Sequence, residues 1–175
     1  MTIVIIEGTD LSGKTTAIDK IAKYFNSGFT LKNNFKPINK QSSIEIYEHY
    51  WKIISMILEY ERLNPKELIL LDRFYPSQAI YSYLRGKDEL HSLEIMNLDN
   101  YCFDKNFKII YINTEINEII KRYKKIGDEY INSKCDLAII KQRYDLFMAI
   151  KTENNPLFLD TMKKDWIKDV EEFLK

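Results

Sequence analysis

The sequence predicts an α/β protein with a parallel sheet of about five strands that helices cover on both faces. Unbroken apolar runs of four residues, of the kind that a parallel sheet buries on both faces, lie at 3–6 and 68–71. Segments with apolar residues at helical spacing separate these runs from further short apolar ones. Because strands and helices alternate along the chain, we expect right-handed βαβ units and therefore a parallel sheet.

The first part of the chain predicts a strand at 3–6, a helix over 15–25 and a brief strand at 29–31 within a polar stretch. Ser42 and Glu45 then form the Ser-x-x-Glu pattern of a capping box, in which both side chains satisfy free N–H groups at a helix start. We therefore expect a helix over 43–63. Its apolar stripe consists of Ile46, Tyr50, Ile53, Ile54, Ile57 and Leu58.

The second part begins at Asn64 and Pro65, which end that helix before the apolar run at 68–71. No linker or repeat interrupts the 175 residues, so we expect a single domain. In order, the expected elements are a helix over 77–84, a turn at 85–87, a helix through Cys102, a strand at 107–112, a helix from Ile116, a helix over 135–151, a strand at 157–159 and a helix over 165–174.

The composition excludes a strong global field, because Lys plus Arg and Asp plus Glu each number 26. We therefore expect neither nucleic acid nor a membrane surface as a partner. A basic-then-apolar leader does not follow Met1 and no apolar run approaches bilayer length, so a cytoplasmic location is expected. Cys102 and Cys135 show neither metal spacing nor a disulfide framework, and we interpret both as packing residues.

The stretch from Gly8 to Thr15, Gly-Thr-Asp-Leu-Ser-Gly-Lys-Thr, has the pattern of a phosphate-binding P-loop. Glycines at both ends let backbone N–H groups wrap an anion, and the following helix points its N-terminus at the phosphates. Lys14 can reach the β- and γ-phosphates, and the Thr15 hydroxyl can hold Mg²⁺. The competing interpretation is a glycine-rich turn without a ligand, which the strand before and the helix after disfavour.

Asp72 stands at the carboxyl end of the predicted strand 68–71, on the side of the sheet where the P-loop also opens. A GTPase would carry Asp-x-x-Gly after such a strand and an Asn-Lys-x-Asp guanine reader. Here Asp72 is followed by Arg-Phe-Tyr, and Asn39-Lys40 continues Gln-Ser. The sequence therefore disfavours a GTPase.

Three stretches together resemble the thymidylate kinase family of P-loop nucleoside monophosphate kinases. Residues 7–16 resemble its Glu-Gly-x-Asp…Gly-Lys-Thr-Thr loop, and 72–81 resemble its Asp-Arg-Tyr…Ser…Ala-Tyr signature, with Phe74 in place of Tyr. Residues 121–127, Lys-Arg-Tyr-Lys-Lys-Ile-Gly, resemble its basic lid, which we expect over about 121–133. The resemblance implies a single-domain P-loop kinase fold and phosphoryl transfer from ATP, with Mg²⁺, to a deoxynucleoside monophosphate, first of all dTMP.

The resemblance also implies a role for each matched position. Lys14, Asp10, Arg73 and Arg122 would be catalytic, with Arg73 clamping the acceptor's 5′-phosphate as a planar fork. Thr15 and Asp72 would hold the metal, Asp72 through its water shell. The ATP set is Gly8, Leu11, Ser12, Gly13, Lys14, Thr15, Thr16, Arg122, Lys124 and Lys125, and the acceptor set is Asp10, Lys52, Arg73, Phe74, Ser77, Gln78 and Tyr81.

The sequence departs from the family at several positions. Leu11 stands where some members place an Arg, so the resemblance implies that the lid supplies that cation. The Phe-x-x-x-Arg of the family has no clear match, and counting back from Asp72 puts its Arg on Lys52. The alternative to a lid at residues 122–125 is an ordinary solvated helix face. The resemblance further implies a homodimer that pairs through the helix over 43–63.

The sequence leaves two alternatives open. A deoxynucleoside kinase on the same scaffold would need a carboxylate to take a proton from a hydroxyl, for which Glu7, Glu45 and Glu48 are the candidates. A nucleotide-binding module without catalysis is the other, motivated by the missing Phe-x-x-x-Arg and a lid with one arginine.

Overall fold

The structure is a computed structural model that describes residues 2–31, 42–85, 92–127, 131, 133–150 and 155–175. Five parallel strands form one sheet in the order β2-β3-β1-β4-β5. The predicted fold class is confirmed. The strands are β1 (Thr2–Glu7), β2 (Phe29–Leu31), β3 (Leu68–Asp72), β4 (Lys108–Ile112) and β5 (Leu157–Leu159).

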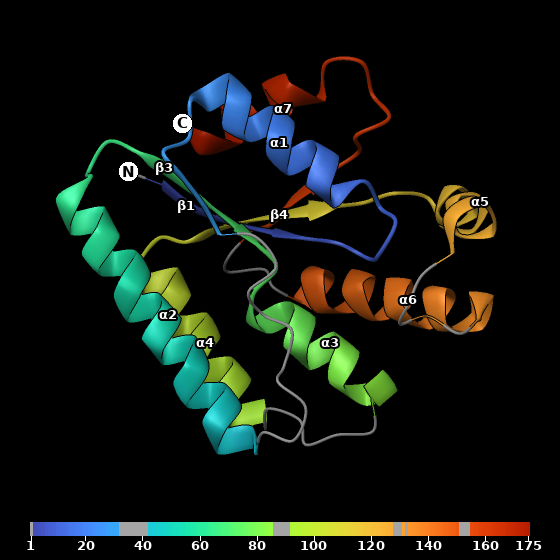
Figure 1. Ribbon diagram of the computed structural model, residues 1–175, viewed down its shortest axis with the longest axis horizontal. Coiled ribbons are helices and arrows are strands. Elements are labelled where there is room, and N and C mark those ends of the chain that lie inside the picture. The colour runs from blue at the N-terminus through green and yellow to red at the C-terminus, as the bar shows by residue number, and fades with distance from the viewer. Residues whose placement is uncertain (1, 32–41, 86–91, 128–130, 132, 151–154) are drawn as a thin grey trace.

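Helices cover both faces of the sheet, with α1 and α7 on one face and α2, α3, α4 and α6 on the other (Figure 1). The remaining helix, α5, lies beyond the end of β4 and packs against α6. Within the described residues, no end of a predicted helix or strand differs from the observed end by more than two residues. The helices are α1 (Lys14–Phe25), α2 (Ser43–Leu63), α3 (Tyr75–Arg85), α4 (Ser92–Asp104), α5 (Ile116–Ile126), α6 (Lys134–Ile150) and α7 (Trp166–Leu174).

Two predicted segments lie partly outside the described residues. The turn expected at 85–87 is described only at its first residue, and the lid expected over about 121–133 is described as far as Gly127 and again at 131 and 133. Gly127 ends α5 with a φ of 73°, a left-handed conformation that a glycine adopts without a steric penalty.

The central strands β1, β3 and β4 have apolar interiors because each one faces two cores. Ile3 and Ile5 point into the larger core with α2, α3, α4 and α6, whereas Val4 and Ile6 point into the smaller core with α1 and α7. This alternation follows from the two-residue side-chain period of a strand. It explains why the sequence shows unbroken apolar runs instead of alternating polar and apolar residues.

Cysteine burial follows the helix faces. Cys102 is 2% exposed and lies in the larger core, as predicted, but Cys135 is exposed and the prediction that it is a packing residue is wrong. Cys135 begins α6, whose buried stripe starts only at Leu137 and continues at three- and four-residue steps. Its side chain therefore lies off the packed face.

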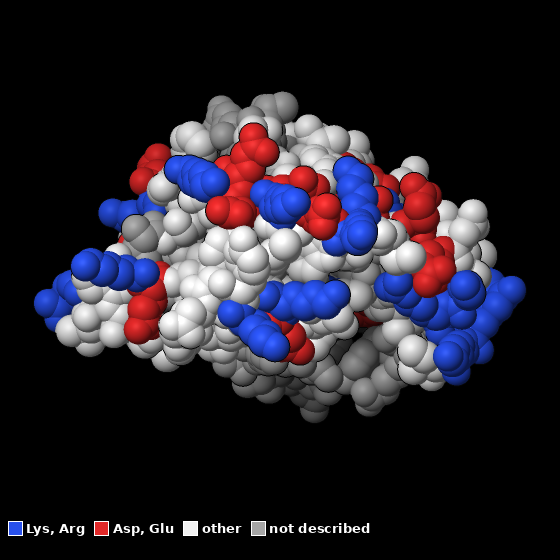
Figure 2. All heavy atoms as spheres, turned by 90° about the horizontal axis from the view of Figure 1, so that it is seen from above, with Lys and Arg blue, Asp and Glu red and all other residues white. Residues whose placement is uncertain are grey.

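The surface carries charges of both signs. Figure 2 shows Lys and Arg interspersed with Asp and Glu over the face formed by α1 and α7, and basic side chains gathered at the end where α5 lies. The exposed basic residues of α5 are Lys121, Lys124 and Lys125. In the part of the chain that the structure describes, no helix is both long and apolar enough to cross a membrane.

The predicted capping box at the start of α2 is confirmed, and it generates a stability prediction. The backbone N–H of Glu45 donates to Ser42 Oγ at 3.3 Å, and the backbone N–H of Ser42 donates to Glu45 Oε2 at 2.7 Å. Ser42→Ala removes the first bond and should cost about 1 kcal/mol of unfolding free energy. We expect thermal unfolding to show a loss of roughly 2–4 °C, given the size of the domain.

The matched control is Ser55→Ala in the same helix. The exposed Ser55 hydroxyl donates to the carbonyl of Trp51, one turn earlier in the middle of the helix, at 2.9 Å, and such a bond does not stabilise a helix. Its loss should leave the melting temperature within about 1 °C, because exposed substitutions away from caps change stability little. Equal melting temperatures for Ser42→Ala and Ser55→Ala would contradict a stabilising cap.

Candidate functional site

The loop between β1 and α1 has the backbone of an anion cradle. A Cβ added at Gly8 would lie 2.9 Å from Ser12 Oγ and 3.2 Å from Ile112 Cβ, so another residue there would force its neighbours to shift. Gly13, the N-cap of α1, has a φ of 92°. Both glycines of the predicted P-loop are therefore required by its geometry, and the loop places the N-terminus of α1 at the cavity.

A cavity of about 570 Å³ opens where this loop meets the carboxyl ends of the strands. It is lined by residues of the predicted ATP and acceptor sets and by residues that were not predicted, which come from α1, α5, the connection from β5 to α7, and the start of α7. The predicted lining residues are Asp10, Leu11, Gly13, Lys14, Thr15, Thr16, Arg73 and Arg122, and the added ones include Lys20, Ile126, Thr161, Met162 and Trp166.

Lys14 is buried at the base of the cavity and forms an ion pair with Asp72. Burial lowers the pKa of Lys14, Arg73 lowers it further, and Asp72 opposes both effects. The pair keeps two charges compensated where little water reaches them. Phosphate oxygens entering the loop would offer Lys14 an alternative partner.

The oxygen donors near Lys14 fit Mg²⁺. The Thr15 hydroxyl lines the cavity, and the Asp72 carboxylate lies at the end of the neighbouring strand β3. Among the described residues no cluster of three or more His, Cys, Asp or Glu side chains forms a complete metal site. A hydroxyl and one carboxylate suit an ion that takes its remaining ligands from water and phosphate, as Mg²⁺ does.

Arg73 is held in place at both ends of its guanidinium. Nη2 donates to Asp10 Oδ1 at 2.6 Å, and Nη1 donates to the hydroxyl oxygens of Tyr144 at 2.7 Å and Ser77 at 3.1 Å. The Arg73 backbone has a φ of 70°, a left-handed conformation that costs about 1–3 kcal/mol outside glycine. Such strain persists because the Arg73 N–H bonds to the carbonyl of Ile6 at 3.0 Å and the side chain bonds at both ends.

Glu7 lies behind Arg73 and is completely buried. Its carboxylate accepts bonds from the Phe74 backbone N–H at 2.7 Å, the Ser77 hydroxyl at 2.6 Å and the Tyr144 hydroxyl at 3.1 Å. Burial raises the pKa of Glu7, and the nearby Arg73 charge and the hydrogen bonds only partly oppose it. Glu7 thus contacts the groups that hold Arg73 and has no access to the cavity.

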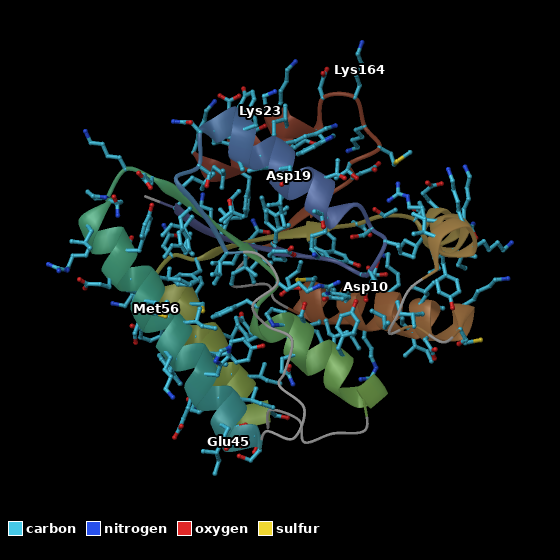
Figure 3. All side chains as sticks on the ribbon, viewed as in Figure 1. Asp10, Asp19, Lys23, Glu45, Met56 and Lys164 are labelled. Carbon is cyan, nitrogen blue, oxygen red and sulfur yellow. The ribbon has the colours of Figure 1, made fainter. Side chains whose placement is uncertain are left out.

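Tyr81 contacts two residues that line the cavity, Asp10 and Arg73. Its hydroxyl donates to Asp10 Oδ2 at 2.8 Å, and its ring lies under the Arg73 guanidinium, 4.9 Å from Cζ to the ring centre. In Figure 3, Asp10 extends from the loop between β1 and α1 toward α6. The structure therefore brings together Asp10, Arg73, Ser77 and Tyr81, as the sequence motif predicts.

Arg122 reaches the P-loop from α5. Its Nη1 donates to the carbonyl of Leu11 at 2.9 Å, and its Nε donates to Glu118 Oε1 at 3.0 Å. Nη1 also lies 3.3 Å from the point where a Cβ on Gly13 would be. Lys124 and Lys125 are exposed and do not line the cavity.

Some residues that were predicted to bind the acceptor substrate lie outside the cavity. Phe74 is fully buried, with its ring 5.0 Å from Tyr50 and 5.6 Å from Tyr75, so its predicted contact with substrate is corrected to core packing. Lys52 is exposed on α2 and does not line the cavity, and Gln78 is buried.

Tyr144 and the β5–α7 connection were missed for different reasons. Tyr144 occupies a regular position on the buried stripe of α6, where its hydroxyl gives no sequence signal. Thr161 and Met162 carry no motif, but they follow the carboxyl end of a parallel strand, which is where ligands bind in such sheets.

The sheet order, the P-loop and the charged cavity at the strand ends are typical of one class of fold. The chain has the fold of the P-loop nucleotide kinases. No protein-family model matches the sequence. The chain is 23% identical over 173 residues to a probable thymidylate kinase of Sulfurisphaera tokodaii, with 92% of this chain and 88% of that protein covered. It is 25% identical over 201 residues to a thymidylate kinase of Campylobacter jejuni, with 98% and 99% covered.

Solved structures agree with this fold. The YorR protein of Bacillus subtilis, in complex with phosphorylated GDP, has a TM-score of 0.72 at 20% identity, covering 99% of this chain and 94% of that chain. Thymidylate kinase of Candida albicans has a TM-score of 0.65 at 19% identity, covering 99% of this chain and 90% of that chain. A deoxyadenosine kinase of M. mycoides with bound dATP has 0.59 at 17%, covering 99% of both chains. The curated relatives confirm the predicted resemblance to thymidylate kinases.

The burial of Glu7 generates a pH prediction. A carboxyl with a raised pKa in the folded state stabilises the fold below its unfolded pKa, near 4.5, and that contribution is lost as the pH rises through the folded pKa. Glu7→Gln has no such titration. Urea unfolding at pH 4.5, 6 and 7.5 should therefore show the parent's advantage over Glu7→Gln shrinking as the pH rises. An advantage that grows with pH would mean that Arg73 lowers this pKa more than burial raises it.

Proposed function

We propose that the chain transfers the γ-phosphoryl group of ATP to the 5′-phosphate of a deoxynucleoside monophosphate, with dTMP as the first candidate. The observation that carries this proposal is the cation at the acceptor side. Arg73 presents its guanidinium beside the P-loop, fixed by Asp10 at one end and by Tyr144 and Ser77 at the other. A planar guanidinium suits the oxygens of a phosphate.

The chemistry needs no general base at this position. A phosphate monoester has a second pKa near 6, so its oxygen is already ionised at neutral pH and can attack directly. What the site must supply is orientation and compensation of charge on the oxygens of the transferred group. Arg73 orients the acceptor, and Lys14 lies at the base of the cavity where the donor phosphates would enter.

Mg²⁺, when bound with ATP, would neutralise charge across the β- and γ-phosphates. Thr15 and Asp72 would hold it, Asp72 directly or through water, since both present oxygens near the P-loop. In this arrangement Lys14 exchanges its bond to Asp72 for the phosphoryl oxygens. The backbone N–H groups at the start of α1 bind the remaining phosphate charge.

Arg122 supplies the cation that Leu11 cannot. Its guanidinium already donates to the Leu11 carbonyl and approaches Gly13, at the rim of the phosphate cradle. From this position Arg122 would compensate charge on the transferred phosphoryl group. Lys124 and Lys125 are exposed on the same helix and would raise the positive electrostatic potential near the cavity without contacting the ligand.

The names of the relatives support a kinase acting on a nucleotide or nucleoside, and two of them name a nucleoside or nucleotide other than dTMP. The M. mycoides neighbour is a deoxyadenosine kinase, and the YorR structure contains phosphorylated GDP. A nucleoside acceptor would need a carboxylate to take the proton of its hydroxyl. This requirement separates the second candidate, a deoxynucleoside kinase, from the first.

The carboxylates available for that alternative are poorly placed. Glu7 is sealed in the core, Glu45 caps the start of α2 well away from Asp10 (Figure 3), and Glu48 does not line the cavity. Asp10 is the one carboxylate among the described lining residues, and Arg73 and Tyr81 hold both of its oxygens. The geometry therefore favours a monophosphate acceptor. The intact Lys14 and Asp72 count against a module without catalysis.

The function is tested by ADP release from ATP and Mg²⁺ across a panel of acceptors. The panel holds dTMP, dGMP, dAMP, dCMP, their ribose forms and the corresponding nucleosides. We expect turnover with at least one deoxynucleoside monophosphate and none with the nucleosides. Turnover of a nucleoside alone would establish the second candidate, and ATP binding without transfer to any acceptor would establish a binding module.

The position of Arg122 generates a kinetic prediction. A group that acts mainly in the transition state lowers kcat when removed and leaves KM nearly unchanged. Arg122→Ala should therefore lower kcat by roughly 10³-fold, the scale of a lost arginine finger, while the KM for ATP stays within about threefold.

The control for Arg122→Ala is Lys121→Ala on the same helix. Lys121 has an 81% exposed side chain and only a loose ion pair with Glu118 at 3.8 Å. Its removal should leave kcat within about twofold, because exposed ion pairs contribute little. If kcat of Arg122→Ala also stayed within twofold, the basic run on α5 would be a solvated helix face.

A further inference from the structure

The Tyr144 hydroxyl lies at the centre of a buried network behind Arg73. It is 2.7 Å from Arg73 Nη1, 2.7 Å from Ser77 Oγ and 3.1 Å from Glu7 Oε2. Tyr144 is fully buried and does not line the cavity. Its hydroxyl is connected to the cavity through the hydrogen bond to Arg73, and its ring packs against Tyr81, which bonds to Asp10.

We propose that Tyr144 is a positioning residue that fixes the direction of the Arg73 guanidinium before the acceptor binds. The inference rests on the proposed function, because it gives Tyr144 a part in binding the acceptor phosphate. The two N–H groups of Arg73 Nη1 have two acceptors, the hydroxyls of Tyr144 and Ser77. The Ser77 hydroxyl donates to the Glu7 carboxylate at 2.6 Å, and the single proton of the Tyr144 hydroxyl is shared between Ser77 Oγ at 2.7 Å and Glu7 Oε2 at 3.1 Å.

This arrangement satisfies every group on the buried side. An ionised carboxylate only accepts hydrogen bonds, a guanidinium only donates them, and each hydroxyl does both. Hydrogen bonds therefore run from Arg73 to the two hydroxyls and from the hydroxyls to Glu7. Nη2, by contrast, is held by Asp10, whose side chain is 28% exposed and lines the cavity. An entering phosphate can replace Asp10 at Nη2 while Nη1 remains fixed.

The Tyr144 ring cannot swing its hydroxyl away. It stacks on Tyr111 with ring centres 5.6 Å apart and planes at 15°, and it meets the edge of Tyr81 at 6.1 Å and 71°. Tyr111 in turn donates its own hydroxyl to Asp145 at 2.9 Å, away from Arg73. A guanidinium held by a rigid partner loses less freedom when it binds a phosphate, so the acceptor binds more tightly.

The experiment compares Tyr144→Phe with Tyr111→Phe. Both changes remove one hydroxyl and keep the stacked rings, but only the first removes a bond to Arg73. With ¹⁵N-labelled arginine, NMR reports rotation of each guanidinium, and Arg73→Gln assigns the Arg73 signal among the five arginines. We expect restrained Arg73 rotation in the parent and in Tyr111→Phe, and faster rotation in Tyr144→Phe.

Kinetics on the active acceptor supply the second readout. Tyr144→Phe should raise the acceptor KM by about tenfold or more, the scale of one hydrogen bond to a charged group, with kcat and the KM for ATP within about twofold. A purely structural role would lower the fraction of active enzyme, and so kcat, without moving the acceptor KM. If Tyr144→Phe does not fold, Glu7→Gln, which weakens the same hydroxyl links, should produce the same NMR change.

The outcomes separate the two proposals. Unchanged Arg73 rotation in Tyr144→Phe, or an equal change in Tyr111→Phe, overturns the positioning role. An acceptor KM that does not move while kcat falls overturns it as well. If Tyr144→Phe shows faster Arg73 rotation but the parent protein turns over no monophosphate, the positioning role is supported and the proposed function is rejected.

Discussion

The structure depends on the compensation of buried charge where β1 and β3 end side by side. The parallel register places Ile6 opposite Asp72, so Glu7 and the P-loop follow one strand while Asp72 and Arg73 end the other. Burying an unpaired charge costs far more than a fold of this size can tolerate. Each cation here therefore has an anion: Lys14 pairs with Asp72, and Arg73 is shared between Asp10 and, through two hydroxyls, Glu7.

Under the proposed function, the same compensation prepares the site for phosphate groups. Lys14 and Arg73 are held by carboxylates that phosphate oxygens can replace, so the cations are oriented before ligands arrive. Glu7 differs, because it is sealed from the cavity and cannot be displaced. It fixes the far side of Arg73, and the left-handed backbone at Arg73, with a φ of 70°, aims the side chain across the cavity toward Asp10. Strain of this kind concentrates at functional sites.

Much of the fold and part of the site were predictable from local patterns. The capping box of α2, the strand runs and the P-loop each depend on residues close together in the chain, whose spacing encodes the local geometry. The Asp72 and Arg73 pair was predictable for the same reason. Phe74 was not, because its contact with Tyr50 forms only when α2 packs on the sheet. Cys135 was misjudged because the buried face of α6 begins two residues later.

The sequence by itself determined the class of fold and the position of the phosphate cradle, because strand runs, helix caps and a glycine-flanked loop are specified by short-range sterics and hydrogen bonding. Only the tertiary structure decided how the charges are partnered. Tyr144 is separated from Arg73 by 71 positions, and Arg122 is separated from Leu11 by 111, yet each pair is joined by a hydrogen bond. Such contacts arise from how α5 and α6 pack beside the sheet, and no local pattern encodes them because the energy comes from burial of surfaces far apart in the chain.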